Sequence, residues 1–391
     1  MDNITDLIIK NGCLLSDGSI QSQGLDDAAI AVRDGVILAV GQTSEITRAF
    51  HATNTWDAGG KWLLPGFVNT HCHLFQIFMR GLGKDLPFMD WMNHSVRLLM
   101  PLLDEEAIYL SAMVGCMEAI RTGTTTVLDF MYANVRPGLA DAVIQAFDDS
   151  GIRGVLARGL TDIDRMPGAD HRPVTWQPVP ETLAEVDQLR RRAAGHPRIS
   201  LALAPSVIWA MTPEGLKESA AYARSQNLLM TMHLLETDDD DRFSQERYGR
   251  RTTALLDEWG VLDGNFLAVH AVRMEMEDLD RFQRHQVRVS HNPVANMLLG
   301  SGAAPICEML QRGIRIGLGT DGAASNDSQS MIEVMKCAAL LQKITRRDPT
   351  ALSARQVFRM ATADGAAAIR MDDQIGSLQT GKRADILVVD F

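Results

Sequence analysis

Several features are scarce in this sequence of 391 residues, and each scarcity excludes a class of protein. Only five cysteines are present, an odd number scattered along the chain, which excludes a disulfide scaffold and predicts reduced thiols in a cytoplasmic protein. No apolar run reaches the roughly 18 residues that a spanning helix needs. The best stretch, 98–117, is broken by Asp104, Glu105 and Glu106. The first residues lack the basic start and apolar run of a secretory signal.

Positive charge is also in short supply. Lysine and arginine total 38 against 49 aspartates and glutamates, so the net charge is −11. This balance argues against a nucleic-acid backbone or an anionic membrane as the main partner. With 46% hydrophobic and 22% charged residues, the chain has the composition of a globular protein and not of a disordered one. We therefore expect a small-molecule partner, and association into a homo-oligomer stays open.

Two kinds of pattern divide the chain. Residues 6–64 hold short apolar runs between turns such as Asn11-Gly12 and Asp34-Gly35, which indicates a small antiparallel β-structure without a helix. Apolar runs and longer amphipathic stretches then alternate. The expected strands are 63–68, 125–130, 154–158, 200–204, 228–233, 266–270, 287–290 and 314–319. The expected helices are 105–121, 138–150, 181–195, 213–226, 244–259, 276–285, 305–312, 330–343 and 354–369.

Eight strands that alternate with helices predict an α/β fold of the (β/α)8 type, a TIM barrel. Turn-and-strand patterns return after residue 371, so that the last segment could pair with the first. We expect a barrel at 65–371 and a small discontinuous β-sandwich domain from 1–64 and 372–391.

Histidines and an aspartate mark the strand ends of this barrel, where TIM-barrel active sites lie. In chain order they are His71, His73, His233, His270, His291 and Asp321. His71 and His73 are two residues apart, so both rings point to one side of an extended segment. His233 and Asp321 would complete a set that suits Zn²⁺, or Fe²⁺ as the alternative, better than Mg²⁺ or Ca²⁺. Such an ion would turn a bound water into a hydroxide nucleophile.

The reaction also needs a group that moves protons. Glu236 lies three residues after His233 and is the best candidate for a general acid and base. Asp321 could share this work, and His270 could hold the water or the substrate. Cys72 points away from the two neighbouring histidines and is assigned to the core. The aspartate run 238–241 is interpreted as a solvated approach to a helix.

These motifs resemble the amidohydrolase superfamily. The matching segments are 65–73 (PGFVNTHCH), 123–126, 233–236, 269–271, 290–293, 319–326, 376–378 and 381–385. They are most similar to the branch of cytosine-type deaminases, S-adenosylhomocysteine/methylthioadenosine deaminases and triazine hydrolases such as atrazine chlorohydrolase. The resemblance implies one metal ion bound by His71, His73, His233 and Asp321. It also implies hydrolytic deamination, in which metal-bound hydroxide attacks a ring carbon and ammonia leaves.

The resemblance is weaker for the substrate. Adenosine-type relatives carry an acidic residue for ribose shortly after the tryptophan that matches Trp91, but 98–101 reads LLMP. They also carry a histidine where Ser206 stands. Gln76 instead resembles the amide of oxopurine, pterin and triazine enzymes, and we expect such a small ring. Further candidate contacts are Trp91, Arg158, Ser206, His291 and Asn296.

Alternatives stay open at this point. S-adenosylhomocysteine or methylthioadenosine deamination, or triazine dechlorination, would use the same ligands. Trp91 could equally be structural, and Arg158 could pair with an internal carboxylate instead of a substrate oxygen. A catalytically inactive binding scaffold would have lost ligands, yet all four are present together with Glu236. Because relatives usually continue past Asp390, we expect the small domain to be truncated at its C-terminal side.

Overall fold

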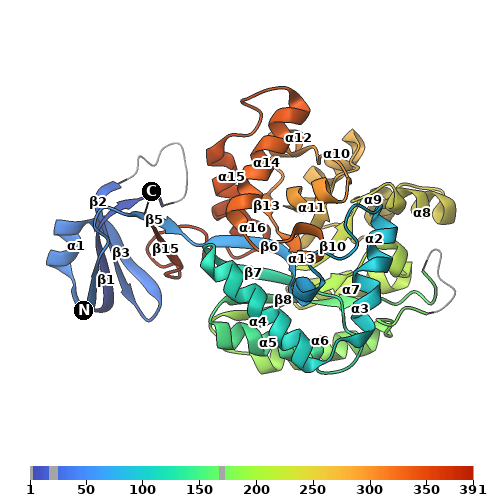
Figure 1. Cartoon of the computed structure of the whole chain (residues 1–391), viewed down its shortest axis with the longest axis horizontal. Coiled ribbons are helices and arrows are strands. Elements are labelled where there is room, and N and C mark those ends of the chain that lie inside the picture. The colour runs from blue at the N-terminus through green and yellow to red at the C-terminus, as the bar shows by residue number, and fades with distance from the viewer. Residues whose placement is uncertain (1–2, 17–24, 167–171, 391) are drawn as a thin grey trace.

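Two sheets organise the protein, and they lie at opposite ends of its long axis (Figure 1). The computed structural model describes residues 3–16, 25–166 and 172–390. Parts of the small domain expected from the sequence, at 1–2, 17–24 and Phe391, fall outside these ranges. Within the described residues, no helix is long and apolar enough to cross a membrane.

The smaller sheet has six strands from both ends of the chain. They are β1 (Ile4–Leu14), β2 (Leu25–Arg33), β3 (Val36–Gln42), β4 (His51–Asp57), β5 (Trp62–Pro65) and β15 (Ile386–Val389). The order is β15-β5-β1-β2-β3, with β4 also paired to β1. β15 runs antiparallel to β5, which confirms that the last segment returns to the first.

Two details of this sheet differ from the expectation. β1 pairs in parallel with β4 and with β5, so the sheet is mixed and not purely antiparallel. A short helix, α1 (Thr43–Ala49), also connects β3 to β4. Only Ile46 of its seven residues is buried, and such a helix is too short to produce a periodic apolar pattern in the sequence.

The larger sheet confirms the TIM-like barrel. Its strands are β6 (Phe67–His73), β7 (Thr124–Met131), β8 (Arg153–Leu160), β9 (Ile199–Pro205), β10 (Met230–Leu234), β11 (Phe266–His270), β12 (Arg288–His291), β13 (Ile316–Leu318) and β14 (Asp321–Gly322). The pairings between these strands are parallel. β13 pairs with β12, and β14, which follows it directly, pairs with β6. This last pairing closes the sheet on itself.

Helices cover the outside of the barrel (Figure 1). They include α4 (Glu105–Arg121), α5 (Leu139–Ser150), α6 (Val179–Ala193), α7 (Pro213–Ser225), α10 (Met276–His285), α12 (Ile306–Gln311) and α14 (Met331–Arg346). Each has buried residues on its inner side, which join the apolar clusters between helices and strands. α4 begins where Asp104 accepts a hydrogen bond from the Ala107 N–H, as an N-cap residue does.

Three expected elements are divided in the structure. The apolar run 63–68 ends β5 of the small sheet and begins β6 of the barrel, because one continuous run serves two sheets. The expected helix 244–259 is two helices, α8 (Asp239–Tyr248) and α9 (Thr252–Glu258). Gly249 separates them with φ 69°, a left-handed conformation that ends a helix. The helix expected at 354–369 is likewise α15 (Ala354–Met360) and α16 (Ala363–Ala368).

Candidate active site

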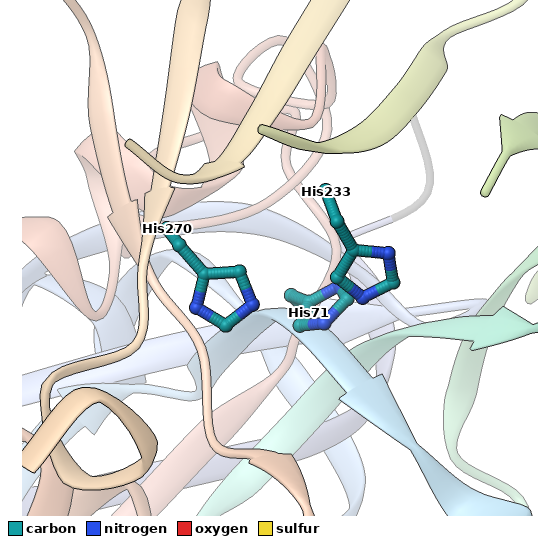
Figure 2. Close-up of side chains that lie close together, drawn as sticks. All are labelled: His71, His233 and His270. Atoms are coloured by element: carbon teal, nitrogen blue, oxygen red, sulfur yellow. The ribbon is translucent and has the colours of Figure 1, made fainter. Parts of the chain in front are cut away.

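Three histidine rings from different strands converge inside the barrel. Figure 2 shows His71 of β6, His233 of β10 and His270 of β11 close together. The His71 ring centroid lies 5.1 Å from that of His233 and 5.9 Å from that of His270. One nitrogen of each of the three lies within 4.8 Å of the others, a spacing suited to a shared ion. The pair His71 and His73 lies on β6 itself, and not after the first strand as expected.

The nitrogens of His73 and His233 are oriented by backbone carbonyls. His73 Nδ1 donates to the Phe130 carbonyl at 2.8 Å, and His233 Nδ1 donates to the Ser206 carbonyl at 2.9 Å. Each Nε2 is then left with its lone pair, and the two Nε2 atoms are 3.2 Å apart. Two lone pairs that face each other at this distance repel unless a cation lies between them. The donor set therefore fits a metal ion.

Asp321 supplies an anionic oxygen to the same point. Its Oδ1 lies 3.3 Å from His71 Nε2 and 3.2 Å from His73 Nε2. Burial alone would raise the pKa of this carboxyl, but contacts with His71 and His73 hold it well below the usual range. Burial, followed by the charge of His73, lowers the pKa of His71 to about 3. The site therefore presents a carboxylate and neutral imidazoles, which are the protonation states that bind metals.

The backbone is strained at this point. Asp321 has φ 63°, His270 has φ 72° and Ala271 has φ 48°, all in the left-handed region that residues with a Cβ seldom adopt. Leu235, between His233 and Glu236, has φ 52°. Such strain persists where surrounding packing imposes it, and it concentrates at functional sites.

Glu236 faces His270 beside the histidine cluster. Its Oε2 lies 3.5 Å from His270 Nε2, and its buried Oε1 has no hydrogen-bond partner among the described residues. Burial, followed by the charge of Asp321, raises the pKa of Glu236 to about 8. His270 is held from behind, where its Nδ1 donates to Asn296 Oδ1 at 2.9 Å. A buried carboxyl with this pKa is suited to proton exchange near neutral pH.

A cavity of about 850 Å³ opens over these groups. Five of the expected metal-ligating and catalytic residues line it: His73, His233, Glu236, His270 and Asp321. His71 lies beneath them, fully buried. The aromatic and apolar part of the wall includes Phe88, Met89, Trp91, Met92, Met166 and Trp209. The cavity therefore combines a polar floor with apolar walls, as small-molecule sites do.

Three of the expected substrate contacts reach this cavity: Gln76, Trp91 and Ser206. Gln76 Nε2 donates to the Tyr132 hydroxyl at 2.9 Å, and its buried Oε1 has no partner among the described residues. A Cβ on Gly322 would overlap this Oε1, so the glycine leaves room for the amide. Trp91 is fixed because its Nε1 donates to the Ala324 carbonyl at 3.2 Å.

The other three do not line the cavity. Arg158 forms an ion pair with Glu185 at 2.8 Å and donates a hydrogen bond to Gln177. Its partner is therefore an internal carboxylate and not a substrate oxygen. Asn296 accepts a hydrogen bond from His270, which itself lines the cavity. His291 is fully buried, and neither ring nitrogen has a hydrogen-bond partner among the described residues. These corrections arise because a position at a strand end does not decide which way a side chain points.

Three further residues of the cavity were not identified from the sequence. Tyr132, two residues after a strand expected to end at 130, packs against His73 with ring centroids 4.9 Å apart. Asp240 was interpreted as solvated, yet it is buried and accepts from Trp209 Nε1 at 3.0 Å. Burial raises its pKa to about 8. Arg97 also lines the wall.

Known proteins share this architecture over nearly the whole chain. The model of the amidohydrolase family matches residues 62–391. The chain belongs to the amidohydrolase family. A 5-methylthioadenosine/S-adenosylhomocysteine deaminase of Syntrophobacter fumaroxidans is 36% identical over 389 residues, which cover 99% of this chain and 85% of that protein. Membership confirms the resemblance found in the motifs, and with it the expected hydrolase of carbon–nitrogen bonds.

Two solved structures were obtained with zinc. An adenosine deaminase from Xanthomonas campestris with bound zinc has a TM-score of 0.90 and 29% identity, covering 100% of this chain and 86% of that one. Atrazine chlorohydrolase from Arthrobacter aurescens, complexed with zinc, has a TM-score of 0.89 and 26% identity, covering 97% and 86%. Both agree with the amidohydrolase barrel found here.

Proposed function

We propose that this amidohydrolase is a metal-dependent deaminase that hydrolyses an amino group from a small N-heterocycle. The observation that carries the proposal is the pair of Nε2 lone pairs on His73 and His233, 3.2 Å apart. They face Asp321 on the floor of a cavity whose edge holds Glu236. A hydrolase that attacks a ring carbon needs these two features side by side: a place for a cation and a buried group that exchanges protons.

One divalent ion, Zn²⁺ or alternatively Fe²⁺, would be held by His71, His73, His233 and Asp321. When bound, such an ion lowers the pKa of a coordinated water toward neutrality. Glu236, with a pKa raised to about 8, would take up a proton from the water side and deliver it to the leaving nitrogen. His270 would keep its Nε2 toward this region because Asn296 fixes the opposite edge of the ring.

The first candidate substrate is an oxopurine, pterin or triazine-like ring. Gln76 supports it, because its unpartnered Oε1 is buried and can accept an N–H from the edge of a ring. Ser206 and Trp91 would provide further contacts in the same cavity.

Methylthioadenosine or S-adenosylhomocysteine is the second candidate. A volume of about 850 Å³ is near the upper end for small-molecule cavities and has room for a ring with a long substituent. The relative of 36% identity bears the name of this activity. Triazine dechlorination, the activity named for one structural neighbour, is tested alongside.

The setting of the reaction is proposed from composition. With a net charge of −11, we infer a small-molecule partner in the cytoplasm, and neither a nucleic acid nor a membrane as partner. Self-association into a homo-oligomer is measured together with activity, by light scattering of the purified protein.

Ammonia release over a panel of rings tests the function. The zinc-loaded protein is incubated with guanine, 8-oxoguanine, pterin, aminotriazines, methylthioadenosine and S-adenosylhomocysteine, and ammonia is measured with a coupled enzyme assay. We expect release from at least one ring, together with the spectral change of that ring. If metal analysis shows a full site and no ring releases ammonia, the proposal is wrong. Chloride release from atrazine without ammonia release would favour the dechlorination alternative instead.

A further inference from the structure

One guanidinium in the wall of the active-site cavity has no anionic partner among the described residues. Arg97 belongs to α3 (Val96–Leu99), a short helix beside the cavity mouth. Apart from the imidazoles, it is the only basic side chain among the described residues that line this cavity. The acidic residues of the lining have other contacts: Glu236 with His270, Asp240 with Trp209 and Asp321 with His73.

The contacts of Arg97 do not neutralise its charge. Its Nη1 donates to Asn93 Oδ1 at 3.1 Å, and its Nη2 lies 3.9 Å from Met166 Sδ. Within the described parts of the chain, no carboxylate lies within 4 Å of it. Arg153 and Arg158, by contrast, are each paired with a carboxylate, Asp385 and Glu185 respectively. Arg97 therefore differs from the arginines whose role is structural.

Apolar residues share the cavity wall with Arg97. Leu98, Met100, Met166 and Val174 are among them, and Met166 contacts the guanidinium. The side chain of Arg97 is partly buried, and this burial lowers the pKa of its guanidinium. A half-buried charge without a partner is costly, and this cost falls when an anion binds beside it.

Arg97 lines the same cavity as the side chains that would contact a ring. Burial raises the pKa of the Tyr132 hydroxyl, and the positive charge of Arg97 opposes that rise. The same hydroxyl accepts from Gln76, and the Tyr132 ring packs on His73. Arg97, Tyr132, Gln76 and His73 all line this cavity, and Tyr132 contacts both Gln76 and His73.

We propose that the preferred substrate is a heterocycle that carries a carboxylate on its ring or on a substituent, and that Arg97 binds this carboxylate. The planar fork of a guanidinium matches the two oxygens of a carboxylate. The inference rests on the proposed function and deepens it, since it names the class of substrate for the same cavity. It makes Arg97 a determinant of specificity that acts on binding and not on the chemical step.

Matched pairs of ligands test the proposal. Pterin is compared with pterin-6-carboxylate, and methylthioadenosine with S-adenosylhomocysteine, because the members of each pair share a ring. For each pair, kcat/KM is measured in the zinc-loaded wild type, Arg97→Gln and Arg97→Lys. Dissociation constants are measured by calorimetry in the Glu236→Gln background, where turnover is suppressed. Arg136→Gln is the charge-matched control, because Arg136 donates to the Pro101 carbonyl and does not line the cavity.

We expect the carboxylated member of at least one pair to be preferred in both measurements. Arg97→Gln should reduce that preference about 10- to 100-fold, the effect of losing a charge-assisted hydrogen bond, because it weakens binding of the carboxylated member more than binding of the neutral member. Arg97→Lys should restore part of the preference because it keeps the charge. Arg136→Gln should leave the preference unchanged, and added salt should weaken it in the wild type.

The outcomes separate this inference from the proposed function. Deamination with a preference that Arg97→Gln does not change overturns the inference and keeps the function. Preferential, Arg97-dependent binding of a carboxylated ring that is never deaminated keeps the inference and overturns the function. If no carboxylated member binds more tightly than its neutral counterpart, the inference is wrong.

Discussion

The side chain of Glu236 is buried beside the proposed metal ligands. Its Oε1 has no partner among the described residues, and its pKa is raised to about 8. Glu236→Gln keeps the shape and the hydrogen-bonding capacity of the side chain but removes its ability to exchange a proton. We expect kcat to fall about 10²- to 10⁴-fold, with bound zinc unchanged. Steady-state kinetics and elemental analysis of the same preparation measure both.

Asp238 provides the matched control for that substitution. It lies two residues further along the same loop, and its side chain is 76% exposed. Asp238→Asn removes a carboxylate from this loop without changing the cavity, so kcat should stay within twofold of wild type. A Glu236→Gln enzyme that keeps a tenth of wild-type kcat would contradict the assignment of Glu236 as proton carrier.

Single residues show how far the sequence could predict this site. The ligands could be identified because strand ends of a barrel converge and because His71 and His73 alternate on one strand. Arg158 could not be placed, since Glu185, its partner, is 27 residues away and nothing local links the two. Asp240 was missed for the same reason: its environment depends on Trp209, which is 31 residues away. Charge partners that are distant in sequence have no local signature.

Among the elements, β8 and the segment that leads into β15 are joined by one ion pair. Arg153, the first residue of β8, is 6% exposed, and its Nε and Nη2 each donate to an Asp385 oxygen at 3.2 Å. Asp385→Asn would leave this guanidinium with a weaker partner. We expect the free energy of unfolding to fall by about 2 kcal/mol, with kcat unchanged, since Asp385 is outside the cavity. Urea denaturation followed by circular dichroism measures the change.

Asp364→Asn is the control for this prediction. Arg359 makes a similar two-point contact with Asp364, but the two side chains are 36% and 31% exposed. Solvent weakens such a pair, so the loss should stay below about 1 kcal/mol. Equal losses in the two variants would show that burial of Arg153 does not strengthen its pair.

Elements could be predicted from the sequence where one pattern served one element. α4 and α10 have the residue limits expected from their periodicity and caps, 105–121 and 276–285. The run 63–68 could not be divided, because its apolar residues enter two cores without a change of pattern. Leu63 packs in the small sheet, whereas Phe67 packs in the barrel. The assignment of neighbouring residues to different sheets is decided by tertiary packing.

For the whole molecule, the proposed metal ligands connect strands that are distant in sequence. His71 and His73 come from β6, His233 from β10 and Asp321 from β14. The β6–β14 pairing that closes the barrel has only two paired positions, Asp321 with Cys72 and Gly322 with His73. A cation bound by both strands would therefore reinforce the closure of the barrel. Metal binding should stabilise the fold as a whole as well as the site.

Thermal unfolding of the metal-free and zinc-loaded protein tests this coupling. At free zinc a hundredfold above Kd, the stabilisation is about 2.7 kcal/mol, which should raise the Tm of a chain of this length by about 3 °C. Magnesium should produce no comparable shift, because imidazole ligands disfavour it. A zinc-loaded protein with the Tm of the metal-free one would show that the site is not coupled to the fold.

The pH dependence of that shift follows from the histidines. Burial lowers the pKa of His71 to about 3 and that of His233 well below its ordinary value, so both stay neutral in the folded protein at pH 5.5. In the unfolded chain they take up protons below about pH 6.5. The free energy of unfolding therefore falls as pH drops through this value, in the metal-free and in the zinc-loaded protein alike. Protons do not compete with zinc at His71 and His233, and the zinc-induced increase in Tm should be similar at pH 7.5 and 5.5. If His71 and His233 had the ordinary imidazole pKa near 6.5, both would take up protons between pH 6.5 and 5.5, and zinc binding would weaken about 100-fold over that pH unit. A zinc-induced Tm increase that vanishes at pH 5.5 would therefore indicate that the two histidines are not buried as the structure has them.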